Sequence, residues 1–404
     1  MHHWTLPNDD WGQWIQSYFS RYPNNIFILW LATVCKTIEL KTGLFDVSSL
    51  TTLELAITCF ITVFTSYLVY KIARKFLSFN GAICTWAIYL LYIALSPWTT
   101  IFYSDSLGLL FPTLLFYLYI RESSSKVFNI IRWPIIYGLG AIAYRIKPQT
   151  FIILIAISII HLCLRAHFFV TDIKVAFTSF LLFIILLQVP NVQVRTLNIQ
   201  LDAEGSFGPQ HFFMMGLNPE TKGVYSEDDY LFTLSYSTKA ERSSADIARA
   251  KERLKSYSIN GYLHLLHDKI LITYADGTFA WGAEGSFWNE IFPEPNTSIS
   301  YRVRSLYYPD GNHRKEWATY SQVFWLTILF FSTFSALSLK SHHRIDIAIL
   351  QLSTIGLFFF EMLFEVRARY IYTYAPIFLI LAAIGVKSIF DFAKAHIVQE
   401  GAVK

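Results

Sequence analysis

The chain has 404 residues, of which 54% are hydrophobic and only 15% are charged. This composition excludes a disordered chain and is typical of a polytopic membrane protein rather than of a large soluble domain. The net charge of +4 is carried by scattered basic residues without a nucleic-acid motif, so we expect no nucleic-acid partner.

Residues 1–51 are predicted to form a segment on the outer face of a membrane. Within it, residues 22–45 are apolar in their first half and carry charges in their second half. An interfacial amphipathic helix explains that mixture better than an additional crossing does. Upstream, Asp9 and Asp10 are candidate catalytic acids, and a simple turn is the alternative interpretation.

Nine windows of roughly 17 to 22 mostly apolar residues are long enough to cross a hydrocarbon core of about 30 Å. Six of them lie within residues 52–190 and three within residues 319–390. The windows are 52–72, 81–98, 105–121, 132–146, 148–165, 173–190, 319–338, 345–363 and 370–388. The sequence therefore predicts an all-α polytopic membrane protein with about nine transmembrane helices. Pro148 is expected to end the fourth helix and separate it from the fifth.

Basic residues in alternate connections define the expected orientation. Lysines and arginines gather on one side, which the positive-inside rule assigns to the cytoplasm together with the tail 391–404. The opposite side then receives residues 1–51 and the central block. We expect a multi-pass plasma-membrane protein with a large extracytoplasmic loop. Because the number of crossings is odd and the N-terminus lies outside, a further crossing is expected upstream of Met1.

The central block, residues 191–318, is too long for an unstructured loop and is predicted to be a small extracytoplasmic domain of mixed helix and strand. Residues 243–257 have a helical apolar stripe, and residues 268–277 suit a helix or a strand that closes in an Asp-Gly turn. The acidic triplet 227–229 is a candidate for a divalent cation. A solvated loop is the simpler interpretation of that triplet, and the sequence assigns no resident metal.

Ionisable residues at the outer ends of the crossings are candidates for function, because charges at membrane depth are costly. Asp105 opens the third crossing, and Arg145 and Lys147 lie in the break after the fourth. Arg367 and Arg369 precede the last crossing. One acid facing several cations suits a reaction in which a lipid-linked phosphate is the leaving group. The cations would hold the phosphate while the carboxylate accepts a proton from an acceptor hydroxyl.

Each of these groups also has a purely structural interpretation. Asp105 can cap the helix that follows it. The two cations of the break can extend toward lipid headgroups. The two arginines before the last crossing can pair with Glu361 or Glu365.

Four stretches resemble motifs of the GT-C superfamily of membrane glycosyltransferases, which includes the protein O-mannosyltransferases and the aminoarabinose lipid A transferase. They are YFSRYPNNIFILW, SPWTTIFYSDSLGLLF, GLGAIAYRIKPQTFIILIAI and EVRARYIYTYAPIFLILAAIGV. The resemblance covers most of the chain through short motifs. It implies transfer of a sugar from a polyprenyl-phosphate donor to a cell-surface glycan, lipid or protein at the outer face of a bacterial plasma membrane.

The resemblance also implies roles for individual residues. Asp105 matches the acid of the second outer loop, and Lys147 lies by the donor phosphate with Arg367 or Arg369. Arg145, in the same break as Lys147, is a further candidate for binding the phosphate. Tyr22, Asn24 and Asn25 lie on the floor of the cavity. Tyr103, in the turn before Asp105, is a further candidate for lining it. The superfamily's main acid follows a first crossing, which is the crossing expected upstream of Met1. Asp9 and Asp10 lie closer to YPNN than the resemblance implies, so the main acid is expected there or upstream.

Two other functions remain open at this stage. A surface polysaccharide polymerase or ligase would rely on arginines of the central block, such as Arg302 and Arg304. A lipid-linked oligosaccharide transporter would show internal repeats and charges at the membrane midplane, and the sequence shows neither.

Overall fold

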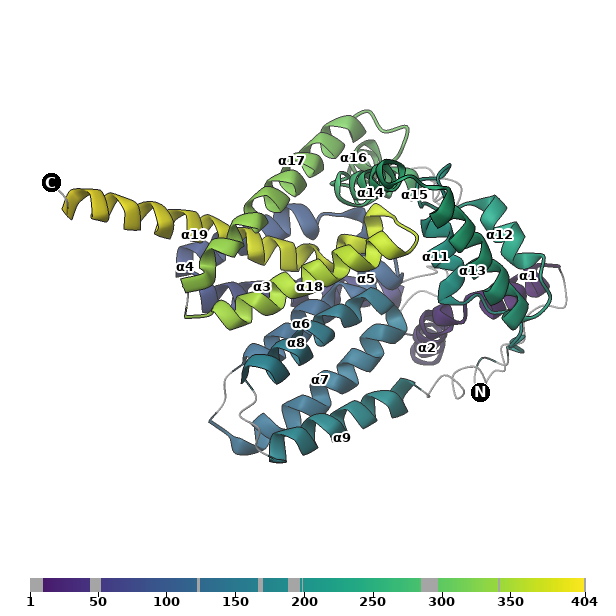
Figure 1. The fold of residues 1–404 in the computed structure, drawn as a ribbon, viewed down its shortest axis with the longest axis horizontal. Coiled ribbons are helices and arrows are strands. Elements are labelled where there is room, and N and C mark those ends of the chain that lie inside the picture. The colour runs from purple at the N-terminus through teal and green to yellow at the C-terminus, as the bar shows by residue number, and fades with distance from the viewer. Residues whose placement is uncertain are drawn as a thin grey trace.

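The computed structural model describes residues 10–43, 52–121, 124–165, 170–187, 197, 199–284, 297–340 and 342–402. The regular elements of these described residues are helices, and they form a helical bundle with smaller helices at one end (Figure 1). The expectation of an all-α protein is therefore confirmed for this part of the chain.

Ten of the helices in the described part of the chain build the bundle. They are α3 (Thr52–Phe76), α4 (Phe79–Ile88), α5 (Ser104–Gly108), α6 (Leu110–Ile120), α7 (Lys126–Ile146), α8 (Ile152–Ile160), α9 (Val170–Leu187), α17 (Arg314–Thr333), α18 (Arg344–Leu363) and α19 (Ala375–Ala402). Helix α8 packs against α18 and α3 packs against α19, so the two apolar halves of the sequence share one core.

Five apolar stretches among the described residues are long enough to cross a membrane. They are Thr52–Phe76, Val127–Ile146, Arg314–Ser338, Arg344–Leu363 and Ala368–Lys394. Four shorter apolar stretches lie at other expected windows: Phe79–Ile93, Ser104–Ile120, Pro148–Cys163 and Phe177–Leu187. The structure thus supports five spans by length, and the nine crossings stay a prediction.

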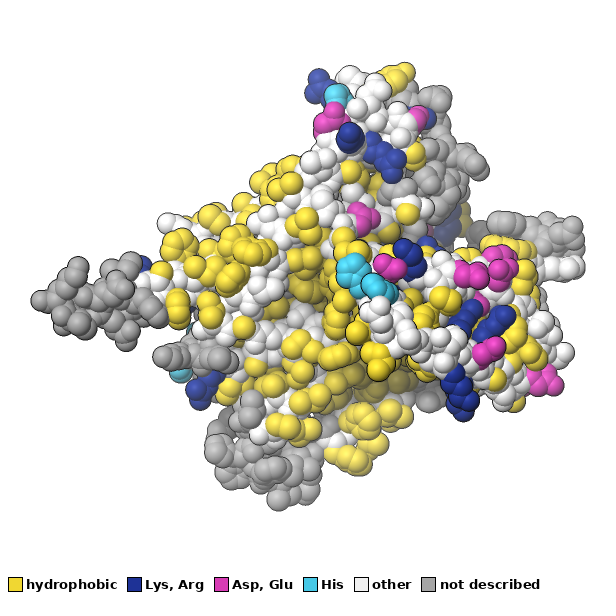
Figure 2. Space-filling model, turned by 45° about the horizontal axis from the view of Figure 1, so that its top comes forward, with side chains coloured by type: hydrophobic (Ala, Val, Ile, Leu, Met, Phe, Trp, Pro, Cys, Tyr) yellow, Lys and Arg dark blue, Asp and Glu magenta, His cyan; other side chains and the backbone are white. Residues whose placement is uncertain are grey.

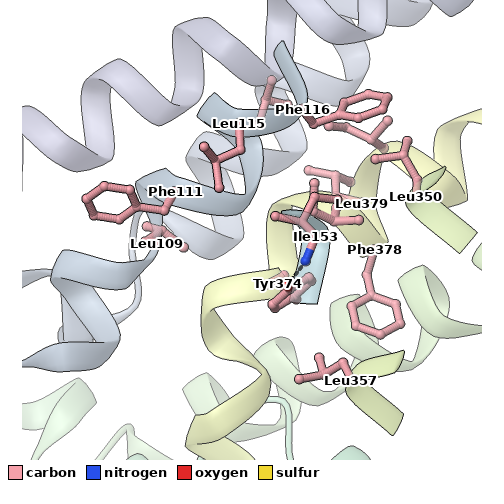
Figure 3. Close-up of a cluster of buried hydrophobic side chains, with 14 of the residues drawn as sticks. Leu109, Phe111, Leu115, Phe116, Ile153, Leu350, Leu357, Tyr374, Phe378 and Leu379 are labelled. Atoms are coloured by element: carbon pink, nitrogen blue, oxygen red, sulfur yellow. Dashed lines mark hydrogen bonds between the residues drawn. The ribbon is translucent and has the colours of Figure 1, made fainter. Parts of the chain in front are cut away.

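A tyrosine hydroxyl stabilises the predicted break at Pro148. A short 3₁₀ turn, η4 (Pro148–Phe151), separates α7 from α8. Within the buried apolar core, the hydroxyl of Tyr374 donates to the carbonyl of Gln149 at 3.0 Å. The same hydroxyl accepts from the amide of Ile153 at 2.9 Å (Figure 3). Since Tyr374 ends the 3₁₀ segment η8 (Ala368–Tyr374), this hydroxyl joins the break to the segment that precedes α19.

The N-terminal part forms α1 (Asp10–Arg21), the turn η1 (Pro23–Asn25) and α2 (Ile26–Thr42). The helix expected within residues 22–45 is therefore present. It ends at Thr42 and is followed by Gly43, whose φ of 60° is the left-handed conformation that glycine adopts easily at a helix C-terminus.

The regular elements among the described residues of the central block are helices, and the expected mixture of helix and strand is not confirmed for them. It contains α11 (Pro209–Gly216), α12 (Glu227–Leu234), α13 (Lys239–Ser256), α14 (Ile259–Tyr274), α15 (Trp281–Glu284) and α16 (Ser298–Tyr307), here called the central domain. Residues 268–274 complete α14. Helix α13 begins before Ser243, because Thr238 and Glu241 form a capping box.

Apolar and charged side chains occupy different parts of the surface. Figure 2 shows apolar side chains spread over the bundle and charged side chains gathered over the central domain and the tip beside α17. Exposed apolar residues on the bundle include Phe60, Val63 and Phe177, each at least 60% exposed. Such a surface suits contact with lipid along the bundle and with water at its domain end.

Candidate functional site

Asp105 lies at the domain end of the bundle with its side chain fully buried. Helix α5 begins at Ser104, and its N-cap is the extended Tyr103, which makes no side-chain capping bond. The alternative that Asp105 caps this helix is therefore wrong. Instead, its carboxylate forms ion pairs with Lys147 Nζ and, at 3.4 Å, with Arg369 Nη1. We call Asp105, Lys147 and Arg369 the ion cluster.

The three residues of the ion cluster come from three places where the long helices are interrupted. Asp105 lies at the start of α5, Lys147 directly before η4, and Arg369 in η8. Gly108 explains their close approach. A Cβ atom on this glycine would lie 2.9 Å from Thr373 Cγ2 and 3.2 Å from Thr150 Cγ2. The absence of a side chain at Gly108 therefore allows α5 to lie against both other segments.

Aromatic rings surround the two cations of the ion cluster. Lys147 Nζ lies 4.8 Å from the ring centroid of Tyr370. The guanidinium carbon of Arg369 lies 5.3 Å from the Tyr103 centroid and 5.4 Å from the Tyr370 centroid. These faces favour the positive charge of both side chains. Tyr103, expected in the cavity, is thus beside Arg369.

The N-terminal segment adds polar groups next to the ion cluster. Asn25 donates to the hydroxyl of Tyr18 at 2.8 Å, and Tyr18 lies within electrostatic range of Tyr103 and Arg369. Burial raises the pKa of Tyr18 and, more strongly, that of Tyr22 above the usual value for tyrosine. Both phenols therefore stay protonated near neutral pH and can donate hydrogen bonds.

A second ion pair lies in the same loop. Arg367 Nε contacts Glu365 Oε1 at 3.1 Å, which is one of the pairings expected from the sequence. The Tyr370 hydroxyl is 3.5 Å from the same oxygen, and the Arg367 guanidinium lies 5.9 Å from the Tyr225 ring centroid. Tyr22 is close enough to Glu365 and Tyr225 for both to influence its pKa. The two ion pairs thus line one region.

A family model described as "conserved hypothetical integral membrane protein" matches residues 2–390. The chain belongs to this family. It is therefore an integral membrane protein, in agreement with the long apolar helices of the bundle. No curated protein and no solved structure is significantly similar to the chain.

Some predicted site residues of this integral membrane protein do not join the ion cluster. Arg145 donates to the carbonyl of Leu187 at 3.4 Å and lies 6.0 Å from the ring centroid of Phe27. Asn24 is exposed and donates to Asn25. Asp9 lies outside the described residues, and Asp10 begins α1 without a described side chain.

The acidic triplet 227–229 starts α12 instead of forming a loop. Asp229 is buried and pairs with Arg253 through two contacts of 2.6 and 3.0 Å, while Asn218 donates to it at 2.8 Å. No group of three or more His, Cys, Asp or Glu side chains within the described ranges is arranged to hold a metal. Asp229 is thus part of the packing of the central domain.

Two buried charged residues near the ion cluster were not singled out from the sequence. Glu361, on α18, is fully buried, and neither carboxylate oxygen accepts a hydrogen bond from the described residues. Lys147 and Lys269 lie within electrostatic range of it. Lys269 could have been found from the sequence, because it is a charged residue in the mostly apolar run LHDKILITY. Glu361 entered the sequence analysis only as a pairing partner for arginine.

Proposed function

We propose that this membrane protein is a glycosyltransferase that moves a sugar from a polyprenyl-phosphate-linked donor to a cell-surface acceptor at the outer face of a bacterial plasma membrane. The observation that carries this proposal is the buried ion cluster at the domain end of the bundle. It contains two cations and one carboxylate, and it lies where apolar helices meet a polar domain.

The excess of positive charge suits a phosphate leaving group. Lys147 offers a point charge and Arg369 a planar fork, which are complementary ways of holding phosphate oxygens. Charge that develops on the leaving phosphate is stabilised strongly in a site shielded from water. A lipid-linked donor would place its chain along the bundle and its phosphate at this depth.

Asp105 has two successive roles in this proposal. In the structure it holds Lys147 and Arg369 next to each other, and both of its oxygens face cations. An arriving phosphate competes for these cations. The carboxylate that they release becomes a stronger proton acceptor and takes the proton of the acceptor hydroxyl.

The polymerase or ligase alternative gains no support from the placement of its arginines. Arg304 pairs with Asp310 at 3.2 Å and lies 5.1 Å from the Tyr308 ring centroid. Arg302 is exposed on the same helix, α16. These contacts are local to α16 and the turn that follows it.

The test uses the purified chain in nanodiscs with a panel of undecaprenyl-phosphate-linked sugars and measures release of undecaprenyl phosphate. We expect Asp105→Asn to lower the rate at least about a hundredfold. The matched control is Asp346→Asn. Asp346, on α18, is also buried, and its carboxylate pairs with Lys75 of α3 at 3.4 Å. Equal rates for wild type and Asp105→Asn, or no turnover of any donor by wild type, would contradict the proposal.

A further inference from the structure

Lys269, on α14 of the central domain, is fully buried and reaches the end of a bundle helix. Its Nζ donates to three backbone carbonyls: Gly216 at 3.0 Å, Met362 at 2.7 Å and Phe364 at 2.8 Å. An ammonium group has three N–H donors, so all of them are used.

These acceptors include carbonyls at the end of α18, which terminates at Leu363. The last carbonyls of a helix have no partner within the helix and carry the negative end of its dipole. A lysine ammonium is therefore suited to satisfy them. Lys269 provides this cap from a helix that belongs to a different part of the chain.

Two backbone amides continue the contact immediately after α18. The amide of Glu365 donates to the carbonyl of Phe212 at 3.0 Å, and that of Val366 donates to the carbonyl of Gly223 at 2.9 Å. The central domain thus holds residues 364–366 through their backbone, directly before Arg367 and Arg369.

Two glycines make this approach possible. A Cβ atom on Gly216 would lie 2.6 Å from the carbonyl carbon and oxygen of Phe364. Gly223 has a φ of 81°, and a Cβ there would lie 3.1 Å from Lys269 Cε. Only residues without a side chain allow α11 and its following turn to press against Lys269 and the loop.

We propose that Lys269 is a positioning residue that holds residues 364–366 so that Arg369 lies against Asp105. The proposal rests on the proposed function only for the consequence in sugar transfer, since the positioning itself concerns the backbone. The central domain then contributes to the site, because it fixes the loop that carries Arg367 and Arg369.

The protonation state of Lys269 should control this contact. Burial lowers the pKa of the Lys269 ammonium to about 8, and the carboxyl group of Glu361, on α18, opposes that shift. A neutral amine has only two N–H donors for three carbonyls. The contact therefore weakens as the pH rises through about 8, and the loop loosens.

The experiment is amide-resolved hydrogen exchange on the full chain in nanodiscs. It follows the amides of Glu365, Val366 and Tyr370, the last of which donates to the carbonyl of Arg367 at 3.0 Å. We expect Lys269→Met to speed exchange at all three by about tenfold or more. Lys222→Met is the control, because Lys222 is an exposed lysine of the same domain that pairs with Asp268.

Each outcome decides the proposal. Unchanged exchange at the three amides would overturn it. Faster exchange at Glu365 and Val366 with no change at Tyr370 would also overturn it, because the segment of Arg369 would then be held independently. If Lys269→Met does not fold, wild-type exchange at pH 7 and pH 9, corrected for the intrinsic rate, provides the same comparison: additional loss of protection at these amides supports the proposal.

Sugar transfer separates this proposal from the proposed function. Lys269→Met should lower the rate about tenfold, and its effect should largely disappear in an Arg369→Gln background. An absence of transfer in wild type, with the exchange result as expected, contradicts the proposed function and leaves the positioning role supported.

Discussion

Asp105 and Asp229 are both buried carboxylates that face two cations, but their surroundings differ. Asp229 is held by Arg253 and Arg249 of the next helix and by Asn218, all within 24 residues. Asp105 is held by Lys147 and Arg369, which lie 42 and 264 residues away. Asp229 stabilises one helix pair, whereas Asp105 draws three parts of the bundle together.

The geometry of the contacts separates the two sites further. Arg253 engages both oxygens of Asp229 at short distances, and this bidentate arrangement is rigid. Arg369 reaches Asp105 through a single long contact. We expect an incoming anion to replace that contact more readily than a bidentate pair. Burial of an ion pair alone therefore does not distinguish a structural site from a functional one.

The largest effect is expected at Asp229. Asp229→Asn leaves Arg253 without its charged partner and should lower the free energy of unfolding of the central domain by about 3 kcal/mol. Denaturant titration followed by hydrogen exchange in α12 and α13 measures this loss. Asp228→Asn, on the exposed face of α12, should have little effect, and equal losses for the two variants would remove the contrast between the sites.

The next effect concerns function rather than stability. Lys147→Gln should lower release of undecaprenyl phosphate about a hundredfold, because one of the two phosphate-binding cations is lost. Arg145→Gln, two residues away, should change it by no more than about threefold, since Arg145 lies against the end of α9. A larger effect of Arg145→Gln would place the phosphate elsewhere.

A pH effect should appear in the central domain. His211 Nδ1 lies 2.7 Å from the hydroxyl of Thr233, which donates to Asp246, and burial lowers the pKa of His211 to about 4. The unfolded chain binds a proton near pH 6.5 and the folded domain does not. Stability should therefore fall as the pH drops from 6.5 toward 4, by about 2 kcal/mol at pH 5.

The raised pKa of Asp246 acts in the opposite direction, because the folded domain then takes up a proton as the pH falls. The measurement is therefore the difference between wild type and His211→Gln in unfolding at pH 7 and pH 5. An identical pH dependence of the two proteins would show that folding does not lower the pKa of His211.

The smallest effect is expected in the framework of the ion cluster. Tyr374→Phe removes the hydroxyl that joins η4 to η8 and should cost about 1 kcal/mol of bundle stability. Thermal unfolding in detergent, with Tyr67→Phe as a lipid-exposed control, measures this change. If Tyr374→Phe equals its control, packing alone holds these segments together.

The sequence was sufficient to predict the long helices of the bundle and to single out the three residues that form the ion cluster. Hydropathy windows locate long helices because spanning a membrane requires about 20 apolar residues. Asp105, Lys147 and Arg369 could be selected because charges within such helices are costly. The choice of Arg369 over Arg367 could not be predicted, because it depends on Arg367 being extended before the 3₁₀ turn that follows it.

Other features depend on contacts between distant parts of the chain. Lys269 meets carbonyls 53, 93 and 95 residues away, and no local pattern identifies such partners. Residues 268–277 were ambiguous because a short apolar run suits a helix or a strand equally well. The packing of α14 against α18 accompanies its helical form.

Gly108 has a consequence for access to the site. Because α5 lies directly on Thr150 and Thr373, the bundle side of the ion cluster is close-packed and resists deformation. Tyr18 of α1 lies within electrostatic range of Arg369, so we expect a ligand that reaches the ion cluster to contact α1. The close-packed contact of α5 with Thr150 and Thr373 is expected to keep its shape when a ligand binds.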